Sequence, residues 1–397
     1  MSNGSKREQI YKCGWLWQTG YYAKTKRKGE RGMREGWEYI CFESCLNKIP
    51  KAKQVKTKEY NSGTKYPIIS QEDKLISGYC DDESMLFHID KPVIIFGDHT
   101  RVLKYIDFDF VVGADGVKII SPKENLNAKF LLYFLTWYNI PNLGYSRHYK
   151  LLKELDIPVP PLSTQLSIVS ELDKINELIR LKKEQLKDYD NLAQSIFYEM
   201  FGDPVVNEKG WEVKKLGELC VSKLKYGSGA SAVDFDGNIR YVRITDINED
   251  GTLNNDIKSP NIVDDEYLLN AGDIVFARSG ATVGKTYLHR KNNIKCLYAG
   301  YLIKATLNTK MALPIYVFQF TQSKYYKDWV NLNARAVAQP NINAKQYGDL
   351  QIPLPPLTLQ QLFAKRIELI EQQKAEIQTT IADLETLLAS RMQYWFD

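Results

Sequence analysis

The chain has 397 residues, of which 44% are hydrophobic, 25% charged and 12% aromatic, as expected of a globular protein with two or more domains. Its net charge of +5 originates in residues 1–32, which carry a balance of +6, so the remainder carries −1. Bulk charge therefore excludes a uniformly basic nucleic-acid binder, and any DNA contact has to rest on local clusters.

Hydropathy and cysteine usage narrow the class of protein further. The sequence shows no apolar run long enough to cross a bilayer and no signal-peptide pattern, so a cytoplasmic location is expected. Its six cysteines include no C-x-x-C pair, which argues against a disulfide framework or a standard zinc site. A metal site made of Cys13, Cys41, Cys45 and Cys80 is conceivable, but buried thiols are the preferred interpretation.

The chain begins with a basic extension, residues 1–32, and repeated material starts near Met33. Gly36-Trp37-Glu38 recurs as Gly210-Trp211-Glu212, and each copy precedes a short β-prone run. These runs open two globular domains, predicted at residues 33–154 and 204–349.

Short Val, Ile, Tyr and Phe runs bounded by Gly, Asp and Asn predict strands in both domains. Together they predict a twisted mixed sheet in each domain, with additional helices. The predicted strands are residues 39–42, 92–96, 117–120, 213–216, 239–243 and 273–276, and the predicted helices are residues 128–138 and 314–329.

A proline-punctuated helix occurs twice, after Ile157–Leu162 and after Ile352–Leu357, with a shift of 195 residues between the copies. Paired prolines keep the preceding segment extended, so each helix has to begin after them, with Ser163 or Thr358 as the expected N-cap. These helical segments are predicted at residues 155–203 and 350–397.

Apolar residues recur at three- and four-residue steps along both helices, a pattern typical of a two-helix coiled coil. At about 1.5 Å per residue, roughly 38 residues make a rod of about 57 Å. Two similar halves joined in this way predict an α+β fold: two similar mixed target-binding domains separated by two long antiparallel coiled-coil helices, with a pseudo-two-fold internal repeat. The alternative is that each helix lies on the core of its own domain.

No catalytic constellation is visible. Ser279–Thr286 resembles a phosphate-binding loop, but only three residues separate Gly280 from Gly284 and no helix pattern follows, so a basic β-turn is the preferred interpretation. The four histidines form no known catalytic or metal-binding motif, and no methyl-donor loop is present. The chain is therefore predicted to catalyse no reaction alone.

Basic and aromatic clusters remain in both domains, and their residue types suit contacts to base edges and phosphates. A solvated surface is the alternative for any single cluster. The candidate DNA-contacting residues are His99, Thr100, Arg101, Lys104, Tyr105, Arg147, His148, Tyr149 and Lys150 in the first domain and Arg278, Ser279, Lys285, Tyr287, Arg290, Lys291, Arg335, Gln339 and Asn341 in the second.

From about Gly36 to the C-terminus the sequence resembles the specificity subunits of type I restriction-modification enzymes. The resemblance rests on a set of motifs in both halves. They are the doubled Ile-Pro-x-Pro-Pro-Leu followed by Gln165 or Gln360, Phe96–Arg101, Gly113–Gly116, Arg147–Tyr149, Arg278–Lys285 and Gln339–Ile342.

The resemblance implies that each domain recognises one part of a bipartite DNA target. The helices would act as a ruler for the unread spacer and, through Gln165 and Gln360, as a dock for two methyltransferase subunits. Those subunits would carry S-adenosylmethionine and adenine-N6 methylation, and two optional restriction subunits would bring ATP- and magnesium-dependent DNA cleavage. The chain itself would be non-catalytic and without a cofactor.

Two other functions remain open at this stage. One is a methyltransferase or nuclease that works alone, and the missing methyl-donor and adenine motifs argue against it. The other is a coiled-coil scaffold that joins partner proteins without reading DNA.

Overall fold

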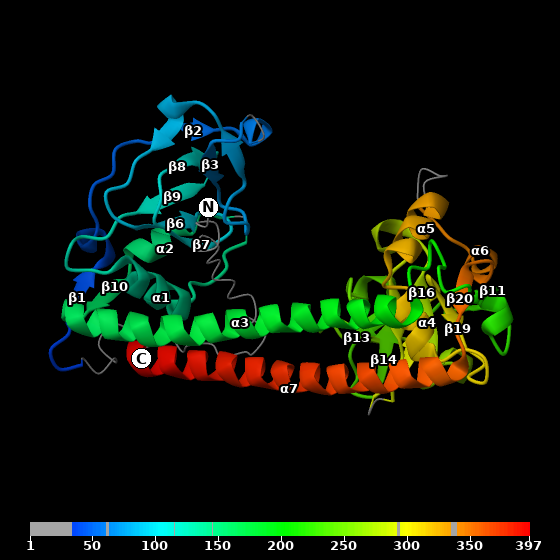
Figure 1. The fold of residues 1–397 in the computed structure, drawn as a ribbon. Coiled ribbons are helices and arrows are strands. Elements are labelled where there is room, and N and C mark those ends of the chain that lie inside the picture. Colours follow the sequence, from blue (N-terminus) through cyan, green and yellow to red (C-terminus); the bar gives the residue numbers. More distant parts are fainter. Residues whose placement is uncertain (1–33, 61–62, 115, 145, 292–293, 335–339) are drawn as a thin grey trace. The chain divides into compact units, whose positions relative to one another are not determined.

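The computed structural model describes residues 34–60, 63–114, 116–144, 146–291, 294–334 and 340–397 (Figure 1). The chain forms two compact units, one of Met1–Leu181 with Thr380–Asp397 and one of Lys182–Thr379. Each unit holds one globular domain and half of each long helix, α3 (Leu162–Phe201) and α7 (Leu357–Phe396). The helices are thus shared between the units, whereas the sequence assigned each of them to a segment of its own.

The first unit contains a five-stranded sheet, a three-stranded sheet and a two-stranded ribbon. Its elements are β1 (Glu38–Cys41), β2 (Gln54–Val55), β3 (Tyr66–Ile69), β4 (Gly78–Cys80), β5 (Leu86–Phe87), β6 (Val93–Gly97), β7 (Leu103–Ile106), β8 (Phe110–Gly113), β9 (Val117–Ile120), α1 (Ala128–Tyr138), α2 (Tyr149–Lys153) and β10 (Asp156–Val159). The larger sheet is mixed, since β8 pairs in parallel with β2 and β3 and antiparallel with β5. Buried Ile69, Ile95 and Val112 join the two sheets in one hydrophobic core.

The second unit is built around a four-stranded antiparallel sheet of order β12-β19-β16-β17. Its elements are β11 (Glu212–Lys215), β12 (Lys225–Tyr226), β13 (Ala232–Asp234), β14 (Ile239–Val242), β15 (Lys258–Pro260), β16 (Ile274–Ala277), β17 (Thr286–Leu288), β18 (Lys295–Tyr298), β19 (Leu302–Ala305), α4 (Pro314–Phe320), α5 (Lys324–Ala334), α6 (Ala344–Gly348) and β20 (Gln351–Leu354). Three two-stranded pairings complete it: β13 with β15, β14 with β18 and β11 with β20.

The two repeated motifs of the sequence pair with each other. In the first unit β1 lies antiparallel to the proline-containing β10, with Tyr39 opposite Pro158. In the second unit β11 pairs with β20 in the same register, with Val213 opposite Pro353. Proline is tolerated because each pairing is only two strands wide and leaves an edge without a ladder partner. This two-stranded pairing therefore joins the start of each domain to the segment directly before its long helix.

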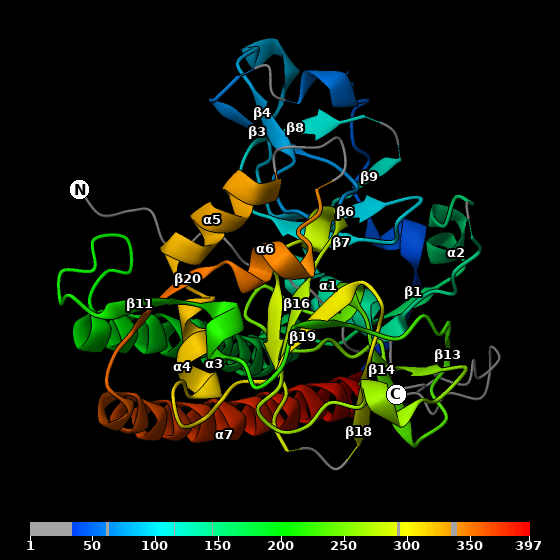
Figure 2. The same cartoon turned by 90° about the vertical axis from the view of Figure 1, so that its right-hand side faces the viewer.

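Inside the first unit the start of α3 and the end of α7 run antiparallel and contact each other (Figures 1 and 2). Glu171 accepts hydrogen bonds from Trp395 Nε1 at 3.0 Å and from the Arg391 guanidinium. The Phe396 ring then packs on α1, 5.5 Å from Phe130 and 5.8 Å from Phe134 between ring centroids.

The second unit repeats this arrangement with the opposite ends of the helices. Lys374 Nζ lies 2.7 Å from Asp190 Oδ1, and the Phe363 ring lies 5.1 Å from that of Phe201. Phe201, the equivalent of Phe396, packs on Tyr316 of α4 at 4.8 Å. Each globular domain is thus covered by the beginning of one long helix and the end of the other, which confirms the predicted α+β fold with antiparallel helices.

Three details differ from the sequence-based predictions. Each long helix begins at the leucine directly after the prolines, so Ser163 and Thr358 lie inside the first turn and do not cap it. The predicted helix 314–329 is two helices, α4 and α5, separated by Thr321–Ser323. Each domain also contains several small sheets rather than one, because short strands interrupted by turns cannot extend a single ladder.

Candidate nucleic-acid interface

In the first domain the loop between β6 and β7 meets the segment that leads into α2. The carbonyl of Asp98 accepts from the His148 backbone N–H at 2.8 Å and from its Nδ1 at 2.9 Å. The buried carboxylate of Asp98 accepts from the Tyr149 backbone N–H at 2.7 Å. Two polar clusters that are 50 residues apart in the sequence therefore form one surface.

The second domain brings together the equivalent segments. The loop between β16 and β17 meets the residues that precede α6: Ile342 N–H donates to the Arg278 carbonyl at 2.8 Å, and Ser279 forms a β-bridge with Asn341. Both domains thus use the same pair of loops, and the side chains in the two pairs differ.

Several predicted residues of the first domain lie on the surface of this loop pair. Thr100, Arg147 and Lys150 are exposed, and His99 is partly exposed. Arg101 has a left-handed backbone with φ of 62°, and its guanidinium donates to the Ile140 carbonyl at 3.0 Å. Burial lowers the pKa of Arg101.

The prediction that Lys104 and His148 contact DNA is corrected by the structure, because both side chains are buried. Lys104 is 4% exposed and donates to the carbonyls of Ser70 at 2.8 Å and Lys74 at 2.5 Å, and burial lowers its pKa to about 8. His148 is 0% exposed, and its Nε2 accepts from the Leu143 N–H at 3.0 Å while Nδ1 faces the Asp98 carbonyl. Both side chains hold loops together and present no atom to DNA.

The two tyrosines of the first cluster are half-buried. Tyr149 packs against Phe42 and Phe96, with ring centroids 6.1 and 6.2 Å apart. Tyr105 lies under Lys129, and burial raises its pKa to about 12. Burial also raises the pKa of Tyr149, so both tyrosines contribute mainly to the packing of the domain.

In the second domain Arg278 stands at the centre of the loop pair. Its Nε donates to Asn341 Oδ1 at 3.3 Å, and its guanidinium carbon lies 4.9 Å from the ring centroid of Tyr226. Tyr226 is 42% exposed and neighbouring Tyr301 is 62% exposed. Sequence reasoning missed both tyrosines, because each lies in a segment far from the basic motifs.

The other predicted residues of this domain are divided between paired and exposed positions. Lys285 is paired with Glu249 at 2.9 Å, and Arg290 faces Glu371 of α7 at 3.7 Å. The Tyr287 hydroxyl lies 3.1 Å from His289 Nδ1, and burial raises the pKa of this tyrosine to about 12. Lys291 is exposed. Arg335 and Gln339 lie outside the residues that the structure describes.

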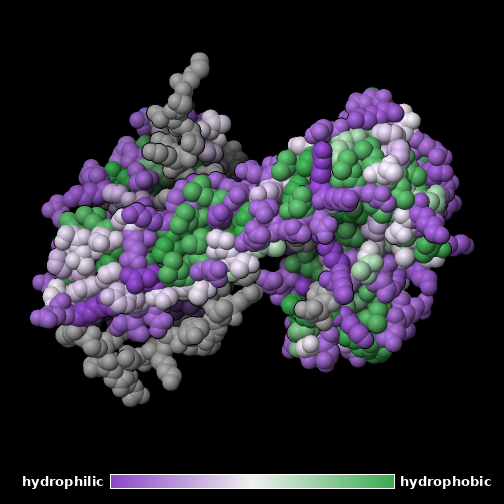
Figure 3. Space-filling model, turned by 60° about the horizontal axis from the view of Figure 1, so that its bottom comes forward, coloured by the Kyte–Doolittle hydropathy of each residue, from purple (hydrophilic) through white to green (hydrophobic). Residues whose placement is uncertain are grey.

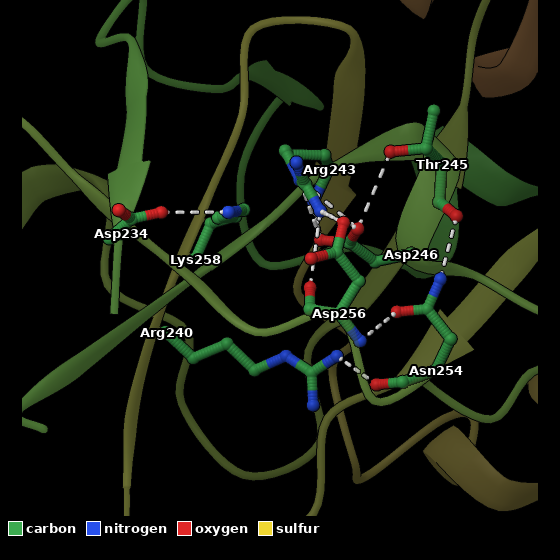
Figure 4. A network of polar contacts seen from close by, with 8 residues as sticks. All are labelled: Asp234, Arg240, Arg243, Thr245, Asp246, Asn254, Asp256 and Lys258. Atoms are coloured by element: carbon green, nitrogen blue, oxygen red, sulfur yellow. Dashed lines mark hydrogen bonds and ion pairs between the residues drawn. The ribbon is translucent and has the colours of Figure 1, made fainter. Parts of the chain in front are cut away.

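Two further arginines of this domain, Arg240 and Arg243, belong to a different network (Figure 4). Arg243 donates to Asp246 at 2.6 Å and to Asp256 at 2.8 Å, while Arg240 donates to the Asn254 carbonyl at 2.6 Å. The carboxylates raise the pKa of Arg243, and the hydrogen bond from Arg243 holds the pKa of Asp256 below its usual range. This network fastens the loop before β15 to β14, and the charge of Arg243 is paired with two carboxylates within it.

The phosphate-loop resemblance is resolved by geometry. The segment after β16 is a 3-10 turn, Gly280–Thr282, followed by the antiparallel strand β17 and not by a helix. Gly280 and Gly284 have φ of 70° and 86°, and a Cβ at Gly284 would lie 2.5 Å from the Val330 side chain. Both glycines are required by the turn and by packing, so the interpretation as a β-turn is confirmed.

The prediction that Gln165 and Gln360 contact a partner subunit is also corrected. Both are 0% exposed, and each amide joins the start of a long helix to a helix of its own domain. Gln165 donates to the Asn125 and Pro160 carbonyls, both at 2.8 Å, and accepts from the Asn127 N–H at 2.7 Å. Gln360 makes the equivalent bonds to Met311, Pro355 and Leu313. These side chains are internal clamps and cannot contact a partner directly.

The long helices carry other surfaces that a partner could contact. Leu192 and Leu387, which correspond under the 195-residue shift, are both 45% exposed. In the first unit a groove of about 530 Å³ is lined by Ser167, Ser170, Glu171, Lys174, Ile175, Leu387 and Arg391. Figure 3 shows that apolar side chains form separate patches among hydrophilic ones on the visible face of each unit.

Within the described part of the chain, no three His, Cys, Asp or Glu side chains are grouped so as to hold a metal ion. Cys45, Cys80 and Cys296 are buried thiols, whereas Cys220 is partly buried and Cys41 is exposed, so the interpretation as buried thiols is wrong for Cys41. Across the described ranges, no helix combines the length and the hydropathy that crossing a membrane requires.

Comparison with known proteins agrees with this architecture. Residues 34–188 and 208–386 match the family described as Type I restriction modification DNA specificity domain, and the chain belongs to this family. The resemblance noted from the sequence is thereby confirmed.

A curated relative is the Type I restriction enzyme EcoR124I/EcoR124II specificity subunit of Escherichia coli, 25% identical over 345 residues that cover 79% of this chain and 81% of the relative. Among solved structures, the S subunit of a type I restriction-modification system from M. genitalium is similar with a TM-score of 0.54 at 16% identity, covering 92% of this chain and 97% of that one. A chain from a structure of the type I R-M system gives a TM-score of 0.51 at 18% identity, covering 92% and 99%. The structural likeness supports the fold.

Proposed function

We propose that the chain is the sequence-recognition subunit of a type I restriction-modification complex, acting on double-stranded DNA in the cytoplasm. One observation carries this proposal: both domains bring the same two loops together on the same frame, but with different exposed side chains. A shared frame with divergent surface loops is what two readers of different half-sites require.

The residues proposed to contact DNA are those that remain on the loop surfaces. They are His99, Thr100, Arg101, Arg147 and Lys150 in the first domain and Arg278, Ser279, Asn341 and Lys291 in the second. Lys285 and Arg290 would contribute only after exchanging their carboxylate partners for phosphates.

The long helices are proposed to fix the distance between the half-sites and to bind two methyltransferase subunits. Exposed leucines at equivalent positions of α3 and α7 support this role, because equivalent surfaces would bind two copies of one partner. S-adenosylmethionine would be bound by those subunits, and ATP and magnesium by two optional restriction subunits. The chain itself is proposed to catalyse no reaction.

The test is base-resolution mapping of methylated adenine in DNA from cells that express the chain with its methyltransferase partner. We expect a two-part motif that requires this chain, and we expect Arg147→Ala to weaken recognition of one part only. The methyltransferase alone is the control. If the chain assembles with the methyltransferase but the methylated sites are the same as for the methyltransferase alone, the scaffold function replaces recognition.

A further inference from the structure

Arg278 directly follows β16, and backbone hydrogen bonds hold it in place. We propose that it is a base-reading residue specific for a guanine in the half-site of the second domain. We further propose that Tyr226 is its positioning residue. This inference rests on the proposed function, to which it adds the base that Arg278 contacts and the residue that orients the Arg278 side chain.

The backbone of Arg278 is fixed on both sides. Its N–H donates to the Tyr301 carbonyl at 3.0 Å, and its carbonyl accepts from the Ile342 N–H at 2.8 Å. The residue directly follows β16, which is hydrogen-bonded to a strand on each side. Since a site carried by rigid elements holds its geometry better than one on a free loop, the guanidinium starts from a defined point.

The guanidinium itself is held at one edge and one face. At the edge, Nε donates to Asn341 Oδ1 at 3.3 Å; at the face, the Tyr226 ring lies 4.9 Å from the guanidinium carbon. Arginine stacks on aromatic rings through cation–π attraction, which restricts rotation of the plane. Tyr226 is fixed in turn, because its hydroxyl accepts from the Ala344 N–H at the start of α6, at 3.1 Å.

The two terminal nitrogens of Arg278 have no acceptor among the described residues. Two other cations of this domain are engaged by carboxylates: Arg243 by Asp246 and Lys285 by Glu249. Arg278 is instead partly exposed and lies beside the ring of Tyr226, which is 42% exposed, so an approaching ligand can reach it. Within the described part of the chain, its terminal donors are therefore available to an acceptor on a bound ligand.

The chemistry of the position favours a base edge over a phosphate. A phosphate contact needs charge but little orientation, and flexible lysines supply it. Here the plane of the guanidinium is preset and its two free nitrogens form a fork, which matches O6 and N7 of guanine in the major groove. The Asn341 amide oxygen accepts from Nε at the opposite edge, which leaves the fork for the ligand.

The test is methylation mapping with the complex of this chain and its methyltransferase, comparing wild type with R278A, R278K, Y226F, Y226L and K310A. We expect R278A to reduce the preference for guanine at one motif position by about tenfold to a hundredfold. The other half of the motif and the spacer should stay unchanged. R278K should relax the same position, because lysine cannot form the bidentate pair.

The tyrosine variants separate positioning from folding. Y226L should relax the same motif position, whereas Y226F keeps the ring under the guanidinium and should retain most of the preference. The control K310A removes one exposed charge of the same unit and should leave the motif unchanged.

Three results would overturn the inference. If R278A and R278K methylate the wild-type motif at a uniformly lower rate, with a shallower salt dependence, Arg278 contacts phosphate. If the wild-type chain directs no motif at all, the proposed function fails and this inference fails with it. A wild-type motif that both arginine variants preserve overturns the inference alone.

Discussion

Single buried amides decide how each long helix is attached to its domain. Gln165 and Gln360 occupy equivalent positions, and each makes one accepted and two donated hydrogen bonds inside the protein. The Pro160 and Pro355 carbonyls lie one residue before the first carbonyl that the helical N–H groups reach, so a buried side chain satisfies them instead.

We predict that Gln360→Leu lowers the free energy of unfolding by about 3 kcal/mol, because it leaves the Leu313 N–H and two carbonyls buried without partners. Urea titration followed by fluorescence measures the change. The neighbouring Gln361 is exposed, so Gln361→Leu is the matched control and should change stability by less than about 0.5 kcal/mol. Equal effects of the two substitutions would show that the buried amide is not a clamp.

Exposure of individual side chains is where the sequence was least informative. Lys104 and His148 lie in polar clusters that resemble binding surfaces, yet both face inward, because carbonyls from distant segments accept their hydrogen bonds. Tyr226 was missed for the converse reason: the contact that places it beside Arg278 joins residues 52 positions apart. Neither outcome follows from local pattern, since both depend on which loops the fold brings together.

At the scale of elements the sequence was a better guide. Helix α1 spans the residues predicted for it, because Asn127 caps its first turn and Asn139 ends it in a left-handed conformation. The long helices follow from apolar spacing and prolines, whose effects are local. The break between α4 and α5 was missed because no proline or glycine marks it.

The charged contact between α3 and α7 in the first unit should make the stability of that unit depend on pH. Hydrogen bonds from Arg391 and Trp395 hold the pKa of Glu171 below its ordinary value of 4.5. A lowered carboxyl pKa means that the unfolded chain binds the proton more readily. The stabilisation is therefore complete above about pH 4.5 and is lost as the pH falls through the folded pKa.

Glu171→Gln should accordingly cost about 1 kcal/mol at pH 7 and less at pH 3. Thermal unfolding at the two pH values tests this, with Glu177→Gln as the control, since Glu177 is paired only with Arg180 of the same helix. A loss of the same size at both pH values would assign the effect to packing.

The exposed leucines of the long helices give a prediction about assembly. Leu192→Asp with Leu387→Asp should reduce co-purification of the methyltransferase at least tenfold, since a carboxylate in an apolar contact is costly. The control is Leu332→Asp on α5, which is 71% exposed and lies on no long helix. If co-purification persists while both proteins stay folded, the docking surface lies elsewhere on the chain.

At the scale of the whole molecule, charge is distributed unevenly, which explains why its total says little. Residues 234–266 contain nine acidic and three basic side chains, a balance of −6 that includes the network of Figure 4. Such a segment repels phosphates, so DNA is expected to approach the second domain at the loops around Arg278 instead. A chain that is nearly neutral beyond residue 32 can thus still carry a local DNA-binding surface.

If the two long helices fix the distance between the half-sites, shortening both together should shorten the spacer. Glu171 contacts Arg391 and Asp190 contacts Lys374, so residues 178–184 of α3 and 378–384 of α7 are matched heptads between these pairs. Removing both heptads shortens each helix by about 10 Å and keeps the apolar faces aligned. Along DNA, a length of about 10 Å corresponds to about 3 base pairs. Methylation mapping should then show both half-sites unchanged and the spacer about 3 base pairs shorter. Deleting only residues 178–184 should abolish methylation, because the remaining contacts fall out of register. An unaltered spacer in an active double deletion would show that the helices do not set the distance.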